Sequence, residues 1–152
     1  MNAAVSNSIA PAAVIVRRTI AASAEELFDA WLDPEALAIW MRPGAAIRTT
    51  EAKVEPRVGG RFEINMHAES GVIPHRGTYQ VIDRPRRLVF TWFSPHTGDR
   101  DSLVTVDFLP RDQRTEVVVT HEQLPEAKRE AHNGGWTRAL ESLDRSYSGK
   151  QS

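Results

Sequence analysis

One long amphipathic helix near the end of the chain constrains the fold more than any other feature. Within the segment 125–147, Trp136, Leu140 and Leu143 recur at intervals of three or four residues and therefore line one helical face. Gly149 is placed to end the run. The chain before this segment has mostly strand character, so this helix has to supply the other half of a hydrophobic core.

Charge and composition narrow the class of protein. The 152 residues carry a formal net charge of −1 with acids and bases interspersed, so we expect neither a nucleic acid nor a membrane as partner. The absence of cysteine excludes disulfides, thiolate metal sites and cysteine nucleophiles, and no apolar run reaches the roughly 20 residues of a membrane span. Residues 1–13 lack the basic and apolar regions of a signal peptide. We predict a disordered tail at 1–13, a single domain at 14–149 and a cytoplasmic location.

The first part of the chain predicts one strand and two short helices. The β-branched stretch 14–20 is typical of a strand. Ser23, with Glu26 three residues later, forms the capping-box pattern of a helix start. Asp33 followed by Pro34 predicts a second helix by the same reasoning, with the aspartate as cap and the proline in the first turn.

From Ile47 onward the chain alternates between apolar and polar residues, which predicts about six antiparallel strands. A loop from Ser70 to Pro74 and a strand at about 76–82 are expected in the middle of this region. The alternation predicts that the following residues face inward: Phe62, Ile64, Met66, Gly77, Tyr79, Val81, Leu88, Phe90, Trp92, Val104, Val106, Phe108, Val117, Val119 and His121.

The order of strand, two helices, strands and long helix predicts an α+β fold. One helix is only about 10–12 Å thick, and strands lie about 4.8 Å apart. A single helix therefore cannot cover a flat sheet of six or seven strands, and the sheet has to curl around it. A sheet curled in this way tends to leave an internal cavity beside the helix.

The ordered motifs resemble a known group of proteins. They are Trp40 to Pro43, Gly59-Gly60-Arg61-Phe62, Gly77-Thr78-Tyr79, Arg87 to Trp92, Thr120-His121, and His132 to Leu143 with its Gly135-Trp136 pair. The chain is similar over 14–147 to small bacterial proteins related to the C-terminal domain of the heat-shock-protein-90 ATPase activator, within the START-related SRPBCC or helix-grip superfamily. The resemblance implies a helix-grip fold with a hydrophobic cavity between sheet and helix. Superfamily members bind lipids, sterols or hormones, or cyclise polyketides, so the resemblance leaves the activity open.

The candidate cavity residues are aromatic, apolar or polar side chains on the predicted inner faces. They are Trp40, Phe62, Met66, Tyr79, Phe90, Trp92, His121, Trp136 and Leu140. Tyr79, Trp92, His121 and Trp136 each bring a polar atom onto an apolar face, where a buried donor without a partner costs about 1–3 kcal/mol. Each of these four needs a neighbour, a water or a ligand, while simple packing also accounts for the large aromatic side chains.

Catalytic and cofactor motifs are missing from the sequence. The five histidines never occur at the close spacing of a metal site, no Gly-x-Ser-x-Gly elbow is present, and Gly59-Gly60 is too short for a phosphate loop. We therefore predict no metal and no cofactor. Gly134-Gly135 in the long helix allows either a hinge or a close approach of the helix to the sheet, and we favour the close approach because Trp136 follows directly.

Three functions remain open from the sequence. We favour binding of a small apolar molecule in the cavity, without catalysis or with weak catalysis. The first alternative is a co-chaperone-like module that stimulates a heat-shock-protein-90 ATPase, although we expect no counterpart here of the eukaryotic activator's further N-terminal domain. The second alternative is a cyclase or hydrolase that uses His121 or Tyr79 in the same cavity. Both a monomer and a homodimer are compatible with the sequence.

Overall fold

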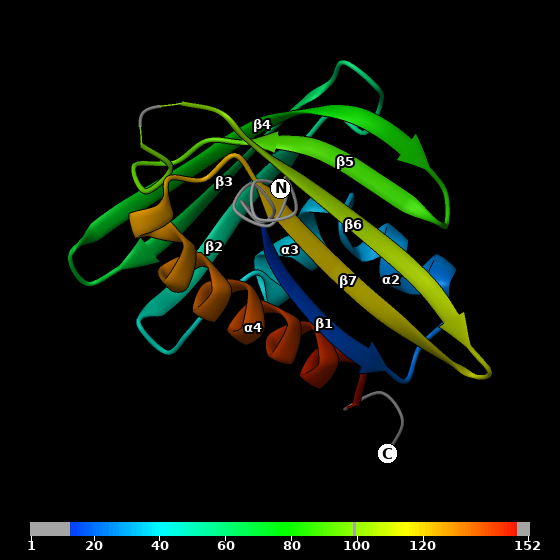
Figure 1. Cartoon of the computed structure of the whole chain (residues 1–152). Helices are drawn as coiled ribbons and strands as arrows, with labels where there is room; N and C mark the ends of the chain where they lie inside the picture. Colours follow the sequence, from blue (N-terminus) through cyan, green and yellow to red (C-terminus); the bar gives the residue numbers. More distant parts are fainter. Residues whose placement is uncertain (1–12, 99, 149–152) are drawn as a thin grey trace, which may run out of the picture.

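The computed structural model describes residues 13–98 and 100–148 and shows an α+β fold (Figure 1). The predicted tail lies outside the described residues except for Ala13, and so does Gly149. The strands are β1 (Val14–Ile20), β2 (Ile47–Val54), β3 (Arg61–Ala68), β4 (Gly71–Asp83), β5 (Arg87–Trp92), β6 (Ser102–Arg111) and β7 (Arg114–Glu122). The helices are α2 (Ala24–Ala30), α3 (Pro34–Trp40) and α4 (Glu126–Ser148). No helix in the described part of the chain is long and apolar enough to cross a membrane.

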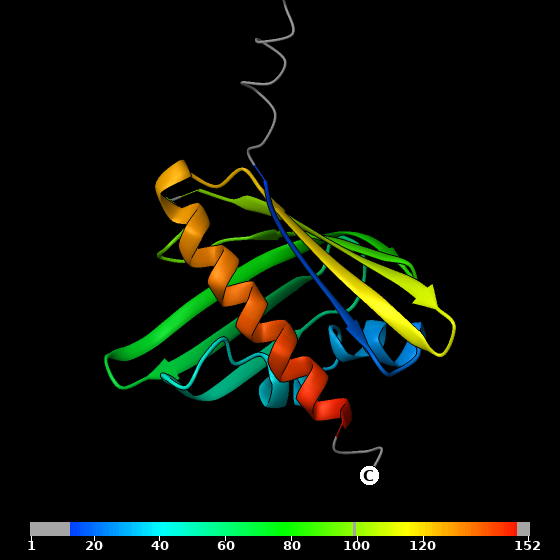
Figure 2. The same ribbon diagram turned by 60° about the horizontal axis from the view of Figure 1, so that its bottom comes forward.

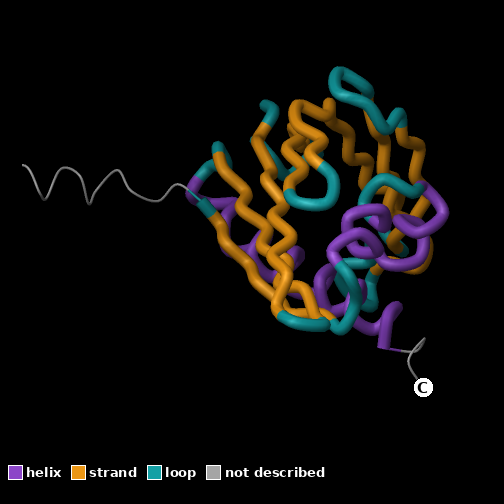
Figure 3. The backbone as a smooth tube through the Cα atoms, turned by 90° about the vertical axis from the view of Figure 1, so that its right-hand side faces the viewer, coloured by secondary structure: helices purple, strands orange, loops and turns teal. Residues whose placement is uncertain are grey.

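The seven strands form one antiparallel sheet in the order β1-β7-β6-β5-β4-β3-β2. Strands β1 and β2 therefore lie at opposite edges, although only α2 and α3 separate them in the chain. Because the chain has to cross from one edge to the other at this point, these two helices cover the inner face of the sheet. The sheet is strongly bent (Figure 3), and α4 runs across its open side, in contact with β1 and α3 (Figure 2). This arrangement confirms the predicted curled sheet closed by one long helix.

The predicted helix starts are confirmed. The Ser23 hydroxyl accepts a hydrogen bond from the Glu26 backbone nitrogen at 3.1 Å, and the Glu26 carboxylate accepts one from the Ser23 nitrogen at 3.2 Å. Asp33 caps α3 by accepting from the Glu35 nitrogen at 2.9 Å, and Pro34 is the first helical residue. Local sequence thus determines where both short helices begin.

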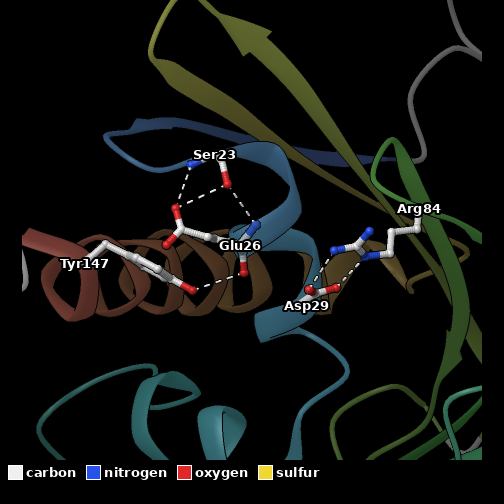
Figure 4. Close-up of polar contacts among 5 residues, drawn as sticks. All are labelled: Ser23, Glu26, Asp29, Arg84 and Tyr147. Atoms are coloured by element: carbon white, nitrogen blue, oxygen red, sulfur yellow. Dashed lines mark hydrogen bonds and ion pairs between the residues drawn. The ribbon is translucent and has the colours of Figure 1, made fainter.

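Polar contacts tie α2 to its surroundings (Figure 4). The Tyr147 hydroxyl, near the end of α4, donates to the Glu26 carbonyl oxygen at 3.1 Å. Arg84, in the turn between β4 and β5, forms a two-pronged ion pair with Asp29 at 2.8 and 2.9 Å. Both partners of this pair are more than half exposed, so the pair fixes geometry more than it adds stability.

The core lies between the inner face of the sheet and the three helices. The inward residues predicted for β3, β5, β6 and β7 are all buried, together with Trp136, Leu140 and Leu143 of α4. Gly77 of β4 faces the same interior, where a side chain would overlap the Thr91 carbonyl oxygen and the Phe62 ring. The glycine is therefore required at this position by a close approach of backbone to backbone.

The predicted loop from Ser70 to Pro74 is wrong, because β4 begins at Gly71 and pairs with β3 from there on. The proline misled the prediction, since its missing N–H usually interrupts a strand. Arg76 exchanges backbone hydrogen bonds with Phe93, just beyond the end of β5. Because backbone nitrogens two residues apart point to the same side of a strand, the nitrogen of Pro74 also points toward the β5 side. β5 does not extend that far, so the missing N–H of Pro74 costs the sheet no hydrogen bond.

The predicted inward orientation of Val81 is also wrong. A register shift between Tyr79 and Val81 in the pairing with β5 reverses the alternation. Val81 is 39% exposed as a result, while Ile82 packs against the core. A bulge of this kind cannot be predicted from the order of apolar and polar residues in the strand.

Candidate functional site

An open pocket of about 240 Å³ lies at the end of the molecule where α4 begins. Its walls are mostly apolar and come from α4, from the ends of β3, β4 and β5, and from the segment that joins α3 to β2. Apolar wall residues are Met41, Ile47, Met66, Ile73, Trp92 and Trp136, and the polar ones are His75, Ser94, His96, His132 and Arg138. A second groove of about 510 Å³, larger and more polar, lies next to it.

The structure places the nine predicted cavity residues in two groups. Met66, Trp92 and Trp136 line the open pocket. Phe62, Tyr79 and Phe90 surround a narrow void of about 10 Å³ deeper in the core, together with Trp92. Trp40, His121 and Leu140 are fully buried and line neither space. The predicted residues are therefore spread over the whole core, whereas the pocket lies at one end of the core.

Gly135 opens onto the pocket. A Cβ atom added to this residue would meet nothing within 4 Å, and one added to Gly134 would approach only the guanidinium group of Arg138. Our prediction that these glycines allow a close approach to the sheet is therefore wrong. The missing side chain of Gly135 instead leaves space in the pocket wall.

A buried chain of hydrogen bonds links α4 to the sheet beside the pocket. The Trp136 indole nitrogen donates to His121 Nδ1 at 2.9 Å. Because indole can only donate, the single proton of the neutral imidazole lies on Nε2, which donates to the Ser102 hydroxyl at 2.7 Å. Ser102 donates in turn to the Trp92 carbonyl oxygen at 2.7 Å. Both nitrogens of His121 are thus committed to structural hydrogen bonds.

This geometry argues against acid–base catalysis by His121. Burial lowers the pKa of His121 to about 3, so the ring stays neutral. The ring donates to Ser102 rather than accepting from it, which is the reverse of what a general base for a serine nucleophile requires. Burial raises the pKa of Tyr79 well above its ordinary value, so this hydroxyl stays protonated. No carboxylate is buried among the described residues to pair with either group.

Three further histidines surround the pocket, and the sequence did not identify them as wall residues. Burial lowers the pKa of His75 to about 4, and its Nδ1 donates to the Ile64 carbonyl oxygen at 3.2 Å. His132 has a lowered pKa, chiefly through burial, and its Nδ1 donates to the Lys128 carbonyl oxygen at 2.8 Å. His96 lies in the loop after β5. In the described residues no cluster of three or more metal-binding side chains is present.

All four tryptophans form one continuous chain of ring contacts beside the pocket. The ring centroids of Trp40 and Trp31 are 4.7 Å apart, those of Trp31 and Trp136 are 6.0 Å apart, and those of Trp136 and Trp92 are 5.2 Å apart. This chain of rings begins in the buried core at Trp40 and ends in the pocket wall at Trp92. The rings therefore hold the wall of the pocket in a fixed shape.

Comparison with known proteins identifies one family. The family described as activator of Hsp90 ATPase homolog 1-like protein matches residues 21–147. None of the curated proteins matches the chain.

Solved structures show the same fold. A protein from Chromobacterium violaceum is 25% identical over 89% of this chain and 96% of its own, with a TM-score of 0.77. An AHSA1-like protein from Aeromonas hydrophila is 24% identical over 91% of this chain and 94% of its own, with a TM-score of 0.77. An HSP90 activator from Plasmodium falciparum is 24% identical over 91% of this chain and 97% of its own, with a TM-score of 0.72.

Proposed function

The chain belongs to the family of activator of Hsp90 ATPase homolog 1-like proteins, and within this family we propose that it binds a small hydrophobic molecule in the pocket beside α4. The observation that carries the proposal is the pocket itself, a mostly apolar hollow of about 240 Å³ that opens to solvent. Pockets for drug-sized ligands usually measure about 300–1,000 Å³. The ligand is accordingly small, with one or two rings or a short chain.

The pocket walls suit binding better than catalysis. Met66, Trp92 and Trp136 offer polarisable, apolar contact surface. The indole nitrogen of Trp136 is paired with His121 Nδ1, and His121 Nε2 is paired with Ser102, so these polar atoms are not available to a reacting group. The ligand is therefore held by contact with the rings, and no wall group identified above would change it chemically.

Blocking the pocket from Gly135 tests the proposal. Purified protein is analysed by native mass spectrometry, and any small molecule it releases on denaturation is identified. We expect a bound apolar compound in the natural protein and its loss in Gly135→Leu, because the new side chain extends into the pocket. Asn133→Leu is the matched control, since it adds the same side chain to an exposed position of α4 outside the pocket. Equal occupancy in both variants would place the ligand elsewhere.

A second candidate is the stimulation of an Hsp90-type ATPase, and one feature of the outer sheet face favours it. By register, Val81, Val89, Thr105, Thr120 and Ile15 lie in one row across five neighbouring strands. Ile15 is 51% exposed and Val81 is 39% exposed. The neighbouring row carries charged side chains, including the Arg87–Asp107 ion pair at 2.6 Å. An uncharged strip bordered by charges has the apolar centre and polar rim of a protein contact surface.

This second candidate is tested with a purified bacterial Hsp90-type ATPase. ATP hydrolysis is measured with and without the chain, and stimulation supports the chaperone role. Ile15→Lys should reduce the stimulation, because it places a charge in the uncharged row. Val58→Lys should leave the stimulation unchanged, since Val58 is also an exposed β-branched side chain but lies in the turn before β3. No stimulation by the natural chain would reject the candidate.

A further inference from the structure

We propose that the ligand of this pocket is an amphipathic anion, whose apolar part enters the pocket and whose acidic group is bound by Arg138 at the mouth. This inference rests on the proposed function and specifies the chemical class of the ligand. It starts from the position of Arg138, which lines both the apolar pocket and a second, more polar groove next to it.

The side chain of Arg138 is held in place without being neutralised. Its Nε donates to the Pro43 carbonyl oxygen at 2.5 Å. Gly44 and Gly134 lie against it, and a Cβ on either residue would come within 3.3 Å or 3.1 Å of a guanidinium nitrogen. Among the described residues no carboxylate lies within 4.0 Å of this group to form an ion pair. Two glycines and one carbonyl group thus orient a cation whose terminal nitrogens are free to bind a ligand.

The groove beside the pocket carries an excess of positive charge. It is lined by Arg42, Arg138 and Arg145 and by a single carboxylate, that of Glu141. None of these three arginines forms an ion pair within the described part of the chain, whereas Arg17, Arg18 and several other surface arginines do. The groove and the pocket share Gly44, Ile47 and Arg138, so they meet at the mouth.

These features together define the ligand. An apolar wall next to three uncompensated guanidinium groups suits a molecule with an apolar body and one acidic group. His75 and His132 do not supply this charge, because burial lowers the pKa of both imidazoles and favours their neutral form. A carboxylate and a phosphate ester share the required chemistry, and arginine binds either of them in a two-pronged manner.

A matched series of ligands tests the charge requirement. Binding of 2-naphthoate, 2-naphthyl phosphate and uncharged 2-naphthol is measured by calorimetry at pH 7 and low salt, and decanoate and 1-decanol form the aliphatic pair. We expect each anion to bind about tenfold or more tightly than its uncharged counterpart. We also expect the advantage to shrink at high salt. The ratio of carboxylate to phosphate binding identifies the acidic group, and the two series identify the apolar body.

Variants of Arg138 test the assignment to this residue. Arg138→Gln should weaken binding of the anions about tenfold or more and leave binding of the uncharged ligands unchanged. Arg138→Lys should restore part of the affinity, because it retains the charge but loses the two-pronged geometry. Arg114→Gln is the matched control, since it removes the same charge from an exposed position, the first residue of β7.

The outcomes separate this inference from the proposed function. If charged and uncharged ligands bind equally well, the pocket binds ligands but the anion preference is refuted. If the anions bind but Arg138→Gln and Arg114→Gln behave alike, the acidic group is bound elsewhere and the inference fails. If no ligand of either series binds, both the inference and the pocket function are rejected.

Discussion

Replacing Gly135 with alanine should make the protein more stable and its pocket smaller at the same time. Glycine inside a helix is about 0.8–1 kcal/mol less favourable than alanine, because glycine loses more backbone freedom on folding. At Gly135 the new methyl group meets no atom within 4 Å, so no clash offsets this gain. We therefore expect Gly135→Ala to raise the free energy of unfolding by about 1 kcal/mol.

Urea unfolding, followed by far-ultraviolet circular dichroism, measures this change directly. For a chain of this length the melting temperature should rise by about 2–4 °C. Gly134→Ala is the comparison variant, because it brings the same gain in helix propensity but places its methyl group 3.1 Å from a terminal nitrogen of Arg138 rather than in open space. Both variants should be stabilised. Binding of uncharged ligands, which does not depend on Arg138, should be weakened only by Gly135→Ala.

A loss of stability in Gly135→Ala would refute the reasoning. It would mean that the first half of α4 packs against the sheet and leaves no open space at this position. A gain in stability with unchanged ligand binding would refute only the second part, since the ligand would then lie away from Gly135. The unfolding measurement therefore tests whether there is open space at Gly135, and the binding measurement tests whether the ligand occupies that space.

Three other perturbations follow from the same structure. Gly77→Ala should destabilise the protein by at least about 2 kcal/mol, because its methyl group overlaps the Thr91 carbonyl oxygen, and a small loss measured by urea unfolding would contradict this. Trp136→Phe should cost about 1–3 kcal/mol by leaving His121 Nδ1 without its donor, and unchanged stability would contradict the hydrogen-bonded chain. Burial holds the folded-state pKa of His75 at about 4 and that of His121 at about 3, below the ordinary value of about 6.5, so the unfolded chain gains these protons first as the pH falls. Stability is therefore complete above pH 6.5, and we expect a loss of about 2 kcal/mol per histidine between pH 7 and pH 5, whereas a flat profile would contradict their burial.

Local patterns predicted most of the fold. The capping box at Ser23 and Glu26 requires only neighbouring residues, and it appears in the structure as predicted. In β5 and β6 the buried face carries the apolar residues, so the alternation of apolar and polar residues in the sequence predicted which side chains face inward. Pro74 and Val81 were misjudged because their environments are set by the neighbouring strand, through the end of β5 and through a shift of register.

The pocket could be predicted only in part. Alternation shows which side chains face inward, but it does not show where along a strand the covering helix lies further from the sheet. Trp92 and Trp136 were identified because they face inward, and they lie at the end of the core where the pocket opens. His75 was missed because it fell next to the predicted loop. Arg138 was missed because it lies on an exposed face of α4, outside the predicted inner faces. Its closeness to the pocket depends on the path of the segment around Pro43, which carries no regular pattern.

The chain of tryptophan ring contacts also has a spectroscopic consequence. Excitation energy passes rapidly between aromatic rings in direct contact, so we expect Trp31, Trp40, Trp92 and Trp136 to absorb and emit as a coupled group. Because Trp92 and Trp136 form part of the pocket wall, a molecule that settles against them changes the emission of the whole group. The near-ultraviolet circular dichroism of such close rings depends on their relative orientation. Binding of the proposed ligand should therefore change the intrinsic tryptophan fluorescence, which allows the proposal to be tested without an attached dye.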